Sequence, residues 1–504
     1  MVFYTIQWLV LLAFAVFIFI RWLISYRFNY WKRRGVPYIK PDSLLFGNLG
    51  FAMKESVFDF FNNLRKTRRD DYFGIYLSWR PALVIQSAEL ARRILVKDYE
   101  YFQDRNVHSG KDDKMGHLNI FTVKNPIWSD MRQHLSPMFT SYRLKLITEL
   151  MNVNAEQLVQ KIERDFVKAN KTVNLKDVFT MYTSDTVAYS VFGIRTSALS
   201  NERSPLWDNI TNHMLNWTYW RGFEFFLIIF MPFWAAIYRA RFFSEVASQK
   251  IAQMFWDTVN ERKKHGKTAY KDLVNHLLML KENAKIPAGE DAKFADDLML
   301  AQVAVFVFGS VETSSTIASC LLHELAYHPE EQEKLFNEID QAYKDNDNKT
   351  LQYDALNSLN YLTACIFETA RRYPPVPFLD RVCNKTYKLN DDVTVEKGTP
   401  ILLNVLALHH SEEEFSDPEV WRPERVTNTS DNNNMQFHFL PFGDGPRFCI
   451  GKRYGLMQIR AGIAQVLHKY RVEPATDSYN IPIDPYSVFT YPKNGCAVKF
   501  IPRN

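Results

Sequence analysis

The sequence predicts a mainly α (α+β) fold: a helix-rich body with a minor β component, preceded by one N-terminal transmembrane helix. Residues 126–344 carry apolar side chains at mostly helical spacing. Strand-like segments are short and lie at 71–86, between 378 and 406, and after 472. The run Val2–Ile20 has no charged residue, and a helix of that length nearly spans a hydrocarbon core about 30 Å thick.

The composition indicates a globular protein with a large apolar interior. Of the 504 residues, 47% are hydrophobic, 23% are charged and 38 are phenylalanine. Such an interior can enclose both a cofactor and an oily substrate. The net charge of +5 is small for this length and gives no reason to expect nucleic-acid binding.

The cysteines argue against a disulfide scaffold and against a structural zinc site. They are odd in number, widely spaced and never arranged as CxxC. A reducing compartment is therefore expected. The five are Cys320, Cys365, Cys383, Cys449 and Cys496.

The N-terminal apolar run is expected to be an uncleaved anchor, residues 1–25. A cleaved signal peptide is the alternative, but it would begin with basic residues and have a shorter apolar stretch. Because basic flanks stay cytoplasmic, the body, residues 42–504, is expected to face the cytosol. A linker with two prolines, residues 26–41, would hold the body at a fixed tilt. The basic residues that follow the run are Arg21, Arg27, Lys32, Arg33 and Arg34.

Two further apolar segments stand out in the body. Residues 296–327 predict one long helix, which ends at His328 because the residue before a proline avoids helical backbone. The block 225–237 is too short to span a membrane and contains Pro232. It is either a buried core helix or a segment that dips into the membrane surface, and the sequence leaves both open.

The most informative segment is FGDGPRFCIG, residues 442–451. A single cysteine, Cys449, stands among glycines just before a helical pattern at 452–469. A helix N-terminus presents unpaired N–H groups and the positive end of the helix dipole, and both stabilise a thiolate. Gly445 and Gly451 would let the backbone approach a flat ligand. A buried structural cysteine in a glycine turn is the alternative that Cys449 alone would favour.

The whole pattern, F-x-x-G-x-R-x-C-x-G, resembles the haem-binding signature of the cytochrome P-450 family. It is complete at Phe442, Gly445, Arg447, Cys449 and Gly451. The resemblance implies the family's triangular prism, with haem b between the long helix and the cysteine loop. It also implies that Cys449 is the axial ligand of the haem iron, where thiolate donation favours O–O cleavage.

A second motif has the order and spacing of the same family. Glu368 and Arg371 form an ExxR pattern and share one helix face. The resemblance pairs them with Arg425 in a buried structural charge network. Val426 stands where phenylalanine is usual, which costs packing only.

The segment GSVETS resembles the family's oxygen-activating element. It implies that Glu312 and Thr313 organise proton delivery, with Gly309 leaving room beside them. A helix face that turns to solvent is the alternative, although a carboxyl group in an apolar run is costly to bury unless hydrogen-bonded or functional. Ser310 stands where glycine is usual, and we expect its hydroxyl to bond the carbonyl of Phe306 one turn back.

The resemblance also implies residues that contact the haem and the substrate. Haem propionates are anions, and the planar fork of arginine suits carboxylates. The expected haem contacts are Arg105, Trp128, Arg132, Arg381 and Arg447. The candidate substrate-lining residues, which imply a lipophilic ligand, are Phe121, Val305, Phe308, Val376, Pro377, Val488 and Phe489.

Two weaker patterns carry no site. The side chains of the adjacent His409 and His410 point apart, and no third ligand has suitable spacing for a metal. Gly443 and Gly445 lack the third glycine and the βαβ context of a dinucleotide fingerprint.

The activity implied is that of a monooxygenase of the endoplasmic reticulum membrane, with its catalytic domain in the cytosol. The sequence texture is similar to that of insect microsomal members that oxidise foreign compounds; oxidation of an endogenous lipid or hormone is equally open. Since nothing in the chain resembles an NADPH or flavin site, electrons are expected from NADPH–cytochrome P-450 reductase, with cytochrome b5 as an additional candidate. Basic contacts for an acidic donor are Arg143, Lys145 and Lys452.

Two other functions stay open. A haem-thiolate isomerase or dehydratase would rearrange peroxides without O2, but such enzymes tend to lack the acid–threonine pair present here as Glu312-Thr313. A membrane-held haem sensor or carrier would need a second axial ligand, and the apolar helix opposite Cys449 offers none. NADPH consumption with added reductase separates the three.

Overall fold

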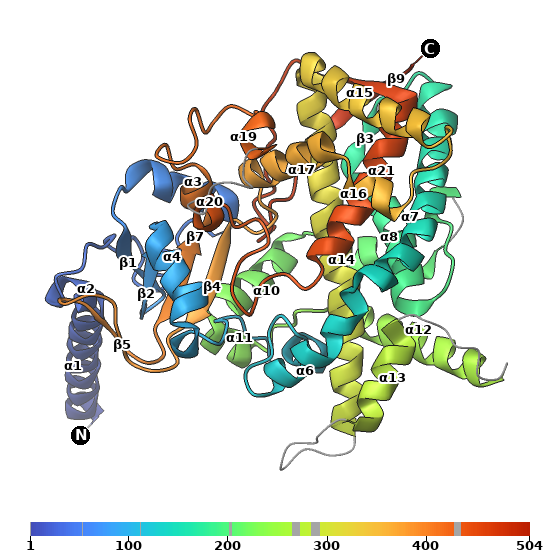
Figure 1. Cartoon of the computed structure of the whole chain (residues 1–504). Coiled ribbons are helices and arrows are strands. Elements are labelled where there is room, and N and C mark those ends of the chain that lie inside the picture. Colours follow the sequence, from blue (N-terminus) through green and yellow to red (C-terminus); the bar gives the residue numbers. More distant parts are fainter. Residues whose placement is uncertain are drawn as a thin grey trace.

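The largest sheet and most of the helices lie on different sides of the body (Figure 1). A four-stranded sheet lies on one side, and the long helix α14 with its helical neighbours lies on the other. The helix-rich fold class with small sheets is therefore confirmed. This computed structural model describes residues 2–52, 54–110, 112–200, 204–264, 273–283, 293–427 and 435–503.

The α-helices account for most of the regular structure. In chain order they are α1 (Val2–Phe28), α2 (Tyr30–Arg33), α3 (Val57–Thr67), α4 (Ala88–Arg92), α5 (Lys114–Leu118), α6 (Ile127–Leu135), α7 (Ser141–Ile162), α8 (Leu175–Phe192), α9 (Pro205–Asn209), α10 (Tyr219–Phe230), α11 (Pro232–Tyr238), α12 (Glu245–Lys264), α13 (Leu273–Asn283), α14 (Lys293–Tyr327), α15 (Pro329–Asp345), α16 (Tyr353–Asn357), α17 (Asn360–Arg372), α18 (Val405–His409), α19 (Glu424–Thr427), α20 (Met435–His438) and α21 (Lys452–Lys469).

The strands form three sheets. The largest has the order β1-β2-β7-β4, in which β2 and β7 are parallel and the other pairs are antiparallel. The hairpin at 72–85 confirms the two short strands expected there, and its turn places Ser78 at a φ of 57°. The strands are β1 (Tyr72–Leu77), β2 (Arg80–Ile85), β3 (Val173–Asn174), β4 (Phe378–Val382), β5 (Tyr387–Lys388), β6 (Thr394–Val395), β7 (Pro400–Asn404), β8 (Tyr470–Pro474) and β9 (Ala497–Pro502).

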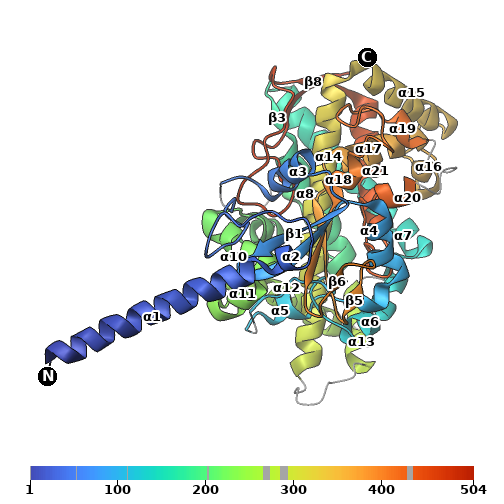
Figure 2. The same cartoon turned by 90° about the vertical axis from the view of Figure 1, so that its left-hand side faces the viewer.

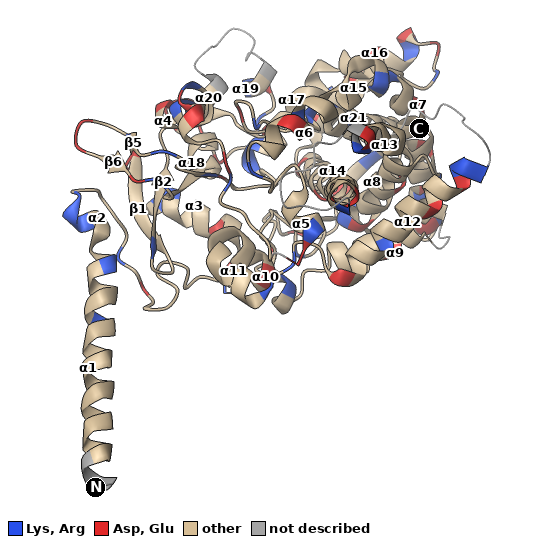
Figure 3. Cartoon of the chain, turned by 90° about the horizontal axis from the view of Figure 1, so that it is seen from below, with Lys and Arg blue, Asp and Glu red and all other residues tan. Residues whose placement is uncertain are grey.

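The N-terminal helix α1 projects away from the body (Figure 2). Its segment Thr5–Phe28 is apolar and long enough to cross a membrane, and none of its most apolar stretch is buried within the protein. Figure 3 shows no acidic residue on this helix and basic ones only toward the body. The helix ends at Phe28, three residues beyond the expected end of the anchor at 25.

The joint between α1 and the body is packed rather than flexible. Trp31 on α2 is fully buried, and its indole Nε1 donates to the carbonyl of Ile75 at 3.1 Å. The hydroxyl of Tyr76 donates to the carbonyl of Phe28 at 2.7 Å. Gly74 lies against the indole, where an added Cβ would come within 2.3 Å of the ring. The indole of Trp31 thus packs against β1 and fixes the base of α1.

The core is organised around α14, which is apolar on every side and packs against α8, α5, α21 and α17. A helix that is hydrophobic all round belongs in the interior of a protein or in a membrane; here two thirds of its most apolar stretch, 67%, is buried in the body. It begins three residues before the expected start and ends at Tyr327 as predicted. The helix predicted at 452–469 is confirmed as α21.

The apolar block at 225–237 divides into two parts at Pro232. Residues 225–230, at the end of α10, are buried in the largest core cluster. Helix α11 instead exposes its apolar side chains, with Phe233 at 70% and Ile237 at 60% exposed. The two alternatives left open by the sequence therefore apply to different halves of the block: the first is a core helix, and the second is an apolar surface.

Candidate functional site

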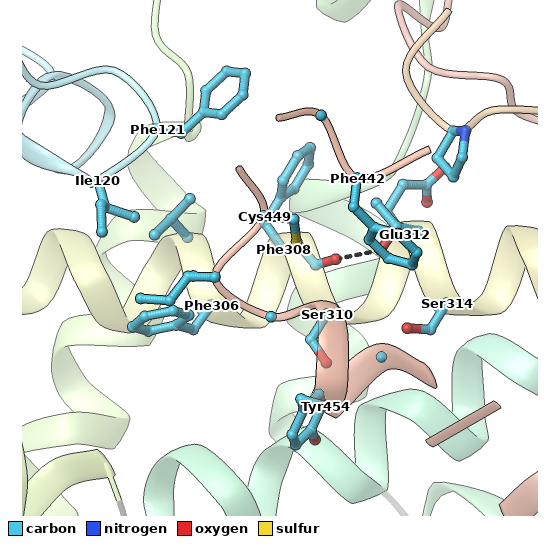
Figure 4. A pocket seen from close by; sticks show the side chains of 18 of the residues that line it. Ile120, Phe121, Phe306, Phe308, Ser310, Glu312, Ser314, Phe442, Cys449 and Tyr454 are labelled. Atoms are coloured by element: carbon cyan, nitrogen blue, oxygen red, sulfur yellow. Dashed lines mark hydrogen bonds between the residues drawn. The ribbon is translucent and has the colours of Figure 1, made fainter. Parts of the chain in front are cut away.

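A cavity of about 340 Å³ lies between α14 and the loop that precedes α21 (Figure 4). Its walls are largely aromatic and aliphatic, with a small number of charged and hydroxyl groups. Residues far apart in the sequence meet here, as expected for a cofactor or substrate site. The expected site residues that line it are Arg105, Phe121, Trp128, Arg132, Val305, Phe308, Gly309, Glu312, Thr313, Val376, Arg381, Phe442, Arg447, Cys449, Gly451 and Phe489.

Cys449 differs from every other cysteine in the chain. The four others are buried, whereas Cys449 is exposed toward the cavity. Its backbone N–H donates to the carbonyl of Phe442 at 2.9 Å, which closes the loop. Low-dielectric surroundings raise the pKa of its thiol, and the Gly451 N–H and the charge of Arg132 offset only part of this rise. A metal cation at Sγ would deprotonate such a thiol outright. The accessibility of Cys449 excludes the buried structural cysteine considered above.

Gly445 has a different role from the expected contact with a flat ligand. It does not line the cavity; its φ is +69°, and an added Cβ would overlap the carbonyl oxygen of Leu95 at 1.9 Å. Its lack of a side chain lets the cysteine loop rest on the backbone that follows α4. The sequence identified the glycine correctly but assigned its close contact to the wrong partner.

Two buried arginines, Arg381 and Arg447, and the partly buried Arg105 form a cluster at one side of the cavity. Arg105 Nη1 lies 3.0 Å from Asp380 Oδ1, and Arg447 Nη2 lies 3.2 Å from Asp104 Oδ1. Arg381 on β4 is buried beside them, and burial followed by repulsion from Arg105 lowers its pKa to about 9. Arg381 Nε and Arg447 Nη1 have no hydrogen-bond partner among the described residues. Buried donors without partners are costly, so the cluster is suited to an anionic ligand.

A fourth cation in this cluster, Lys124, was not singled out by the sequence. Its ammonium donates to the carbonyls of Arg105 and, at 3.0 Å, Val107, and so fixes the loop that carries Arg105. Burial lowers its pKa to about 8 against the attraction of Asp380 and Asp104. An isolated lysine in a loop has no sequence signature. This one lies just before α6, the helix that carries Trp128.

The remaining haem-contact candidates close the same side of the cavity. The guanidinium of Arg447 lies over the ring of Trp128 at 4.2 Å, and that of Arg132 lies over Phe448 at 4.5 Å. Such cation–π contacts hold a guanidinium without consuming its N–H donors. Both arginines therefore keep donors for another partner.

Helix α14 supplies the polar groups of the facing wall. The hydroxyl of Thr313 donates to the carbonyl of Gly309 at 2.7 Å. A Cβ added at Gly309 would meet nothing within 4 Å, so this glycine borders open space. The carboxyl group of Glu312 is buried and lies 3.1 Å from the ammonium of Lys176 on α8. Lys176 is a second charged residue that the sequence did not single out.

The expected bond from Ser310 to the carbonyl of Phe306 is absent. Ser310 instead lies beside the phenol of Tyr454 on α21 (Figure 4). Burial raises the pKa of that phenol to about 12, and the hydroxyls of Ser190 and Ser310 offset part of the rise. Ser190 donates to the carbonyl of Thr186 at 2.9 Å, so the Tyr454 hydroxyl, 3.0 Å away, is its donor. The Ser310 hydroxyl has no hydrogen-bond partner among the described residues, and the Tyr454 phenol is a polar group that lies beside it.

Behind the cysteine loop lies the charge network expected from the ExxR pattern. Arg371 Nε and Nη2 donate to the two oxygens of Glu368 at 2.8 and 2.9 Å. Arg425 Nε donates to the same carboxylate at 3.0 Å. Arg371 also donates to the carbonyls of His409 and Pro418, each at 2.8 Å. The side chains of Glu368 and Arg371 are fully buried.

His409 connects this network to the cysteine loop. Its Nδ1 donates to the carbonyl of Arg371 at 3.0 Å, and its Nε2 accepts the N–H of Leu440 at 2.9 Å. Burial lowers its pKa to about 3, so the ring is neutral and can play both roles. The described residues contain no cluster of three or more potential metal ligands.

Two of the expected lining residues are not at the cavity. Pro377 and Val488 are buried elsewhere, and their neighbours Val376 and Phe489 line the cavity instead. Both pairs lie in bends, so the local backbone decides which side chain of each pair faces the cavity. Val488 belongs to the largest core cluster.

Comparison with known proteins agrees with this geometry. The family model of cytochrome P-450 matches residues 37–500. Cytochrome P-450 6k1 of Blattella germanica is 31% identical over 90% of this chain and 88% of its own length. Probable cytochrome P-450 6d4 of Drosophila melanogaster is 30% identical over 98% of each chain, and cytochrome P-450 6a2 of the same species is 32% identical over 94% and 95%.

The family's cofactor is haem, and the residues present fit it. A single accessible thiol can meet an iron ion, and the unpartnered arginine N–H groups can meet the anionic propionates. A cavity with apolar walls can hold the macrocycle between them. Motifs, fold, cavity and relatives thus agree that the chain belongs to the cytochrome P-450 family and is a haem monooxygenase.

Proposed function

We propose that this enzyme is a membrane-bound monooxygenase that oxidises a lipophilic compound with electrons from NADPH, delivered by a separate reductase. One observation carries the proposal: the accessible thiol of Cys449 and the hydroxyl of Thr313 line the same apolar cavity. An iron held at the thiol would supply oxygen activation there, and the rest of the chemistry depends on the groups around it.

Haem binding is assigned to the residues that meet at the arginine side of the cavity. Arg105, Arg381, Arg447 and Lys124 bring four positive charges, while Asp104 and Asp380 bring two negative ones. Positive charges therefore outnumber negative ones on this side, which suits the anionic propionates of haem b. The full set assigned to haem is Cys449 as the axial ligand, with Arg105, Trp128, Arg132, Arg381, Arg447, Phe442 and Gly451 around it, and Gly309 on the opposite face.

Proton delivery is assigned to Thr313 and Glu312. The Thr313 hydroxyl donates its hydrogen bond to the carbonyl of Gly309. Its oxygen can therefore accept a hydrogen bond from a water molecule. Glu312 supplies an ionisable group on the same stretch of helix. The aromatic walls exclude bulk water, so protons must arrive through such groups.

The substrate is assigned to the lipophilic class because aromatic rings surround the far end of the cavity. Phe308 lies 5.5 Å from Phe242, 5.5 Å from Phe489, 5.9 Å from Phe243 and 6.1 Å from Phe225, measured between ring centroids. Such an enclosure favours apolar molecules and offers them few hydrogen bonds. Foreign lipophilic compounds and endogenous lipids both satisfy it.

The electron donor is assigned to the surface outside the cysteine loop. Phe448 is 45% exposed there, and Lys452 is exposed next to it at the start of α21. Arg143 and Lys145 lie on α7, where Lys145 forms an exposed ion pair with Asp354 at 2.8 Å. Exposed pairs of this kind are weak and can be exchanged for an acidic partner surface.

Membrane attachment is assigned to α1 and to a second apolar surface. Trp79 and Trp234 lie 6.4 Å apart between ring centroids and join two exposed apolar segments. Aromatic side chains of this type favour the membrane interface. The surface consists of Leu44, Leu45, Phe46, Trp79, Tyr219, Trp220, Phe233, Trp234, Ile237 and Tyr238. If it binds lipid, a chain lacking residues 1–25 should still pellet in part with vesicles; a chain that never pellets would refute this second contact.

The reaction is tested by reconstitution with NADPH–cytochrome P-450 reductase and a panel of lipophilic compounds. The expected result is NADPH consumption that depends on reductase and O2, with one oxygen atom in the product. Cys449→Ala should fold but lose the thiolate-ligated ferrous–CO spectrum and all turnover. Turnover of a peroxide without NADPH would favour the isomerase or dehydratase, and a stable six-coordinate haem without turnover would favour the sensor or carrier.

A further inference from the structure

A buried ion pair joins α8 to α14 beside the cavity. Lys176 Nζ lies 3.1 Å from Glu312 Oε2, and the two side chains are only 2% and 1% exposed. The same ammonium also lies 3.2 Å from the carbonyl of Glu312, 2.7 Å from Ser315 Oγ and 3.0 Å from Thr316 Oγ1. Lys176 therefore holds both the carboxylate and the turn of α14 that follows Thr313.

The two oxygens of the Glu312 carboxylate have different surroundings. Oε2 faces Lys176, whereas Oε1 is buried and has no hydrogen-bond partner among the described residues. Glu312 is also part of the cavity wall. A buried carboxylate oxygen without a donor is costly, so a water molecule is expected to donate to it. One oxygen is thus fixed by the lysine while the other is left available for proton exchange.

Packing alone does not explain this ion pair. Taking two charges out of water costs several kcal/mol, and apolar residues of similar size often serve folding as well. The hydroxyl of Ser315 already has a partner in the carbonyl of Val311 at 2.7 Å, so it does not need the lysine. What the lysine adds is a positive charge 3.1 Å from one oxygen of a buried carboxyl group.

We propose that Lys176 is a positioning residue for proton delivery, because it holds Oε2 of Glu312, a residue of the cavity wall, and leaves Oε1 without a donor among the described residues. This inference rests on the proposed monooxygenase function. In each cycle Oε1 takes a proton from water and forms a neutral carboxyl group. The carboxyl group then passes the proton to a hydroxyl or water beside Thr313 and becomes a carboxylate again. One proton moves inward, and Lys176 keeps its own protons throughout.

The other titratable groups around the pair do not take its place. Tyr491 lies with its ring centroid 5.0 Å from Lys176 Nζ, and burial raises its pKa, so it stays neutral. A hydrogen bond with Cys496 and burial raise the pKa of Cys320, so this thiol also stays neutral. Asp177, the neighbour of Lys176 on α8, lies at the surface, and burial raises its pKa. It is a suitable first acceptor for protons from solvent.

The test compares the enzyme with Lys176→Gln, Lys176→Arg, Glu312→Gln and the double variant Lys176→Gln/Glu312→Gln. In Lys176→Gln the carboxyl loses its counter-charge and its pKa rises, so product per NADPH at pH 7 should fall about tenfold while peroxide release rises. Coupling should recover as the pH is raised. Lys176→Arg should restore most of it, and the double variant should match Glu312→Gln with no pH dependence.

Infrared titration supplies a readout that does not depend on turnover. A band of a protonated carboxyl group should appear at pH 7 in Lys176→Gln and be missing from the double variant. Lys161→Gln is the matched control, because Lys161 is a buried lysine on α7 paired with Asp165 at 2.9 Å and lies outside the cavity. It should change the midpoint of thermal unfolding without changing the pH profile of coupling.

Two outcomes would overturn the inference. The first is a Lys176→Gln enzyme that loses stability as Lys161→Gln does but keeps the wild-type pH profile and infrared spectrum. The second outcome applies if Lys176→Gln does not fold: it is a Glu312→Gln enzyme whose product per NADPH is unchanged. A wild-type enzyme that never consumes NADPH with reductase would refute the proposed function instead, and the infrared comparison would still decide whether Lys176 sets the charge of Glu312.

Discussion

Two buried clusters of charge flank the cysteine loop, and they differ in whether they are complete. In the first, Glu368 accepts from Arg371 and Arg425, and the other donors of Arg371 end on backbone carbonyls. In the second, Arg381 and Arg447 each retain a nitrogen without a partner in the described part of the chain, and cations outnumber acids. In a complete cluster, the chain itself supplies a hydrogen-bond partner for each charged group. In an incomplete cluster, the groups without partners indicate a ligand. We therefore assign the first to folding and the second to the cofactor.

The largest expected effect comes from breaking the complete cluster. Arg371→Met would leave the fully buried carboxylate of Glu368 without its main partner, which typically costs about 3–5 kcal/mol. Denaturant unfolding of the haem-free protein should show the loss directly. Arg422→Met is the control, because its side chain forms only an exposed pair with Asp417 at 3.4 Å and should cost under about 0.5 kcal/mol. Similar costs for the two variants would contradict the assignment.

The incomplete cluster should respond in the opposite way. Arg381→Met removes a buried charge that Arg105 repels, so the haem-free protein should keep its stability or gain some. Haem affinity should fall about 10–100-fold, the worth of one charge-assisted hydrogen bond of about 1.5–3 kcal/mol. Haem titration and denaturant unfolding of the same preparation measure both quantities. Lost stability with unchanged affinity would place Arg381 with the structural cluster.

A smaller effect is expected from acid at the complete cluster. Burial lowers the pKa of His409 to about 3 in the folded protein, below the ordinary value of about 6.5. The resulting stability is fully present above pH 6.5 and is lost as the pH falls toward 3, by about 1.4 kcal/mol per pH unit. His409→Gln should therefore reduce the slope of the unfolding free energy between pH 6 and 5 by about one proton. An unchanged slope would mean that His409 is already charged.

The smallest effect is expected at Ser310, whose hydroxyl lies beside Tyr454 and outside both clusters. Ser310→Gly removes a buried hydroxyl that has no hydrogen-bond partner among the described residues, so stability should change by less than about 1 kcal/mol and product per NADPH only modestly. Gly309→Val is the contrasting variant, because it would fill open space in the cavity and should block turnover. A severe loss of coupling in Ser310→Gly alone would make this hydroxyl part of the proton route.

The sequence predicted those parts of the site whose residues occur in fixed local patterns. The cysteine loop and the ExxR pair were found because their spacing is constrained within one turn or one helix. Lys124 and Lys176 were missed because each meets its partners across a long stretch of chain: Lys176 is 136 residues from Glu312. Such pairings depend on helix packing, which one sequence without relatives does not show.

The errors at neighbouring residues have the same physical origin. Composition indicated that the segments at 376–377 and 488–489 are apolar, but only the backbone direction decides which member of each pair faces the cavity. Ser310 was assigned a bond within its own helix because the sequence shows local partners only. In the block at 225–237 the core-helix alternative holds for residues 225–230, while Pro232 begins a helix with exposed apolar side chains whose contact with a membrane stays a prediction.

The burial of Trp31 in the sheet has a consequence for the order in which the protein is made. Ribosomes release the N-terminus first, so α1 and Trp31 are synthesised long before β7 completes the sheet at residues 400–404. The helix can already be in the bilayer while the site that receives the indole is unfinished. If α1 enters the bilayer first, completion of the sheet would bury an indole whose neighbouring helix is already anchored. Deletions that stop at residue 28 spare this last step, and those that reach past Trp31 remove it.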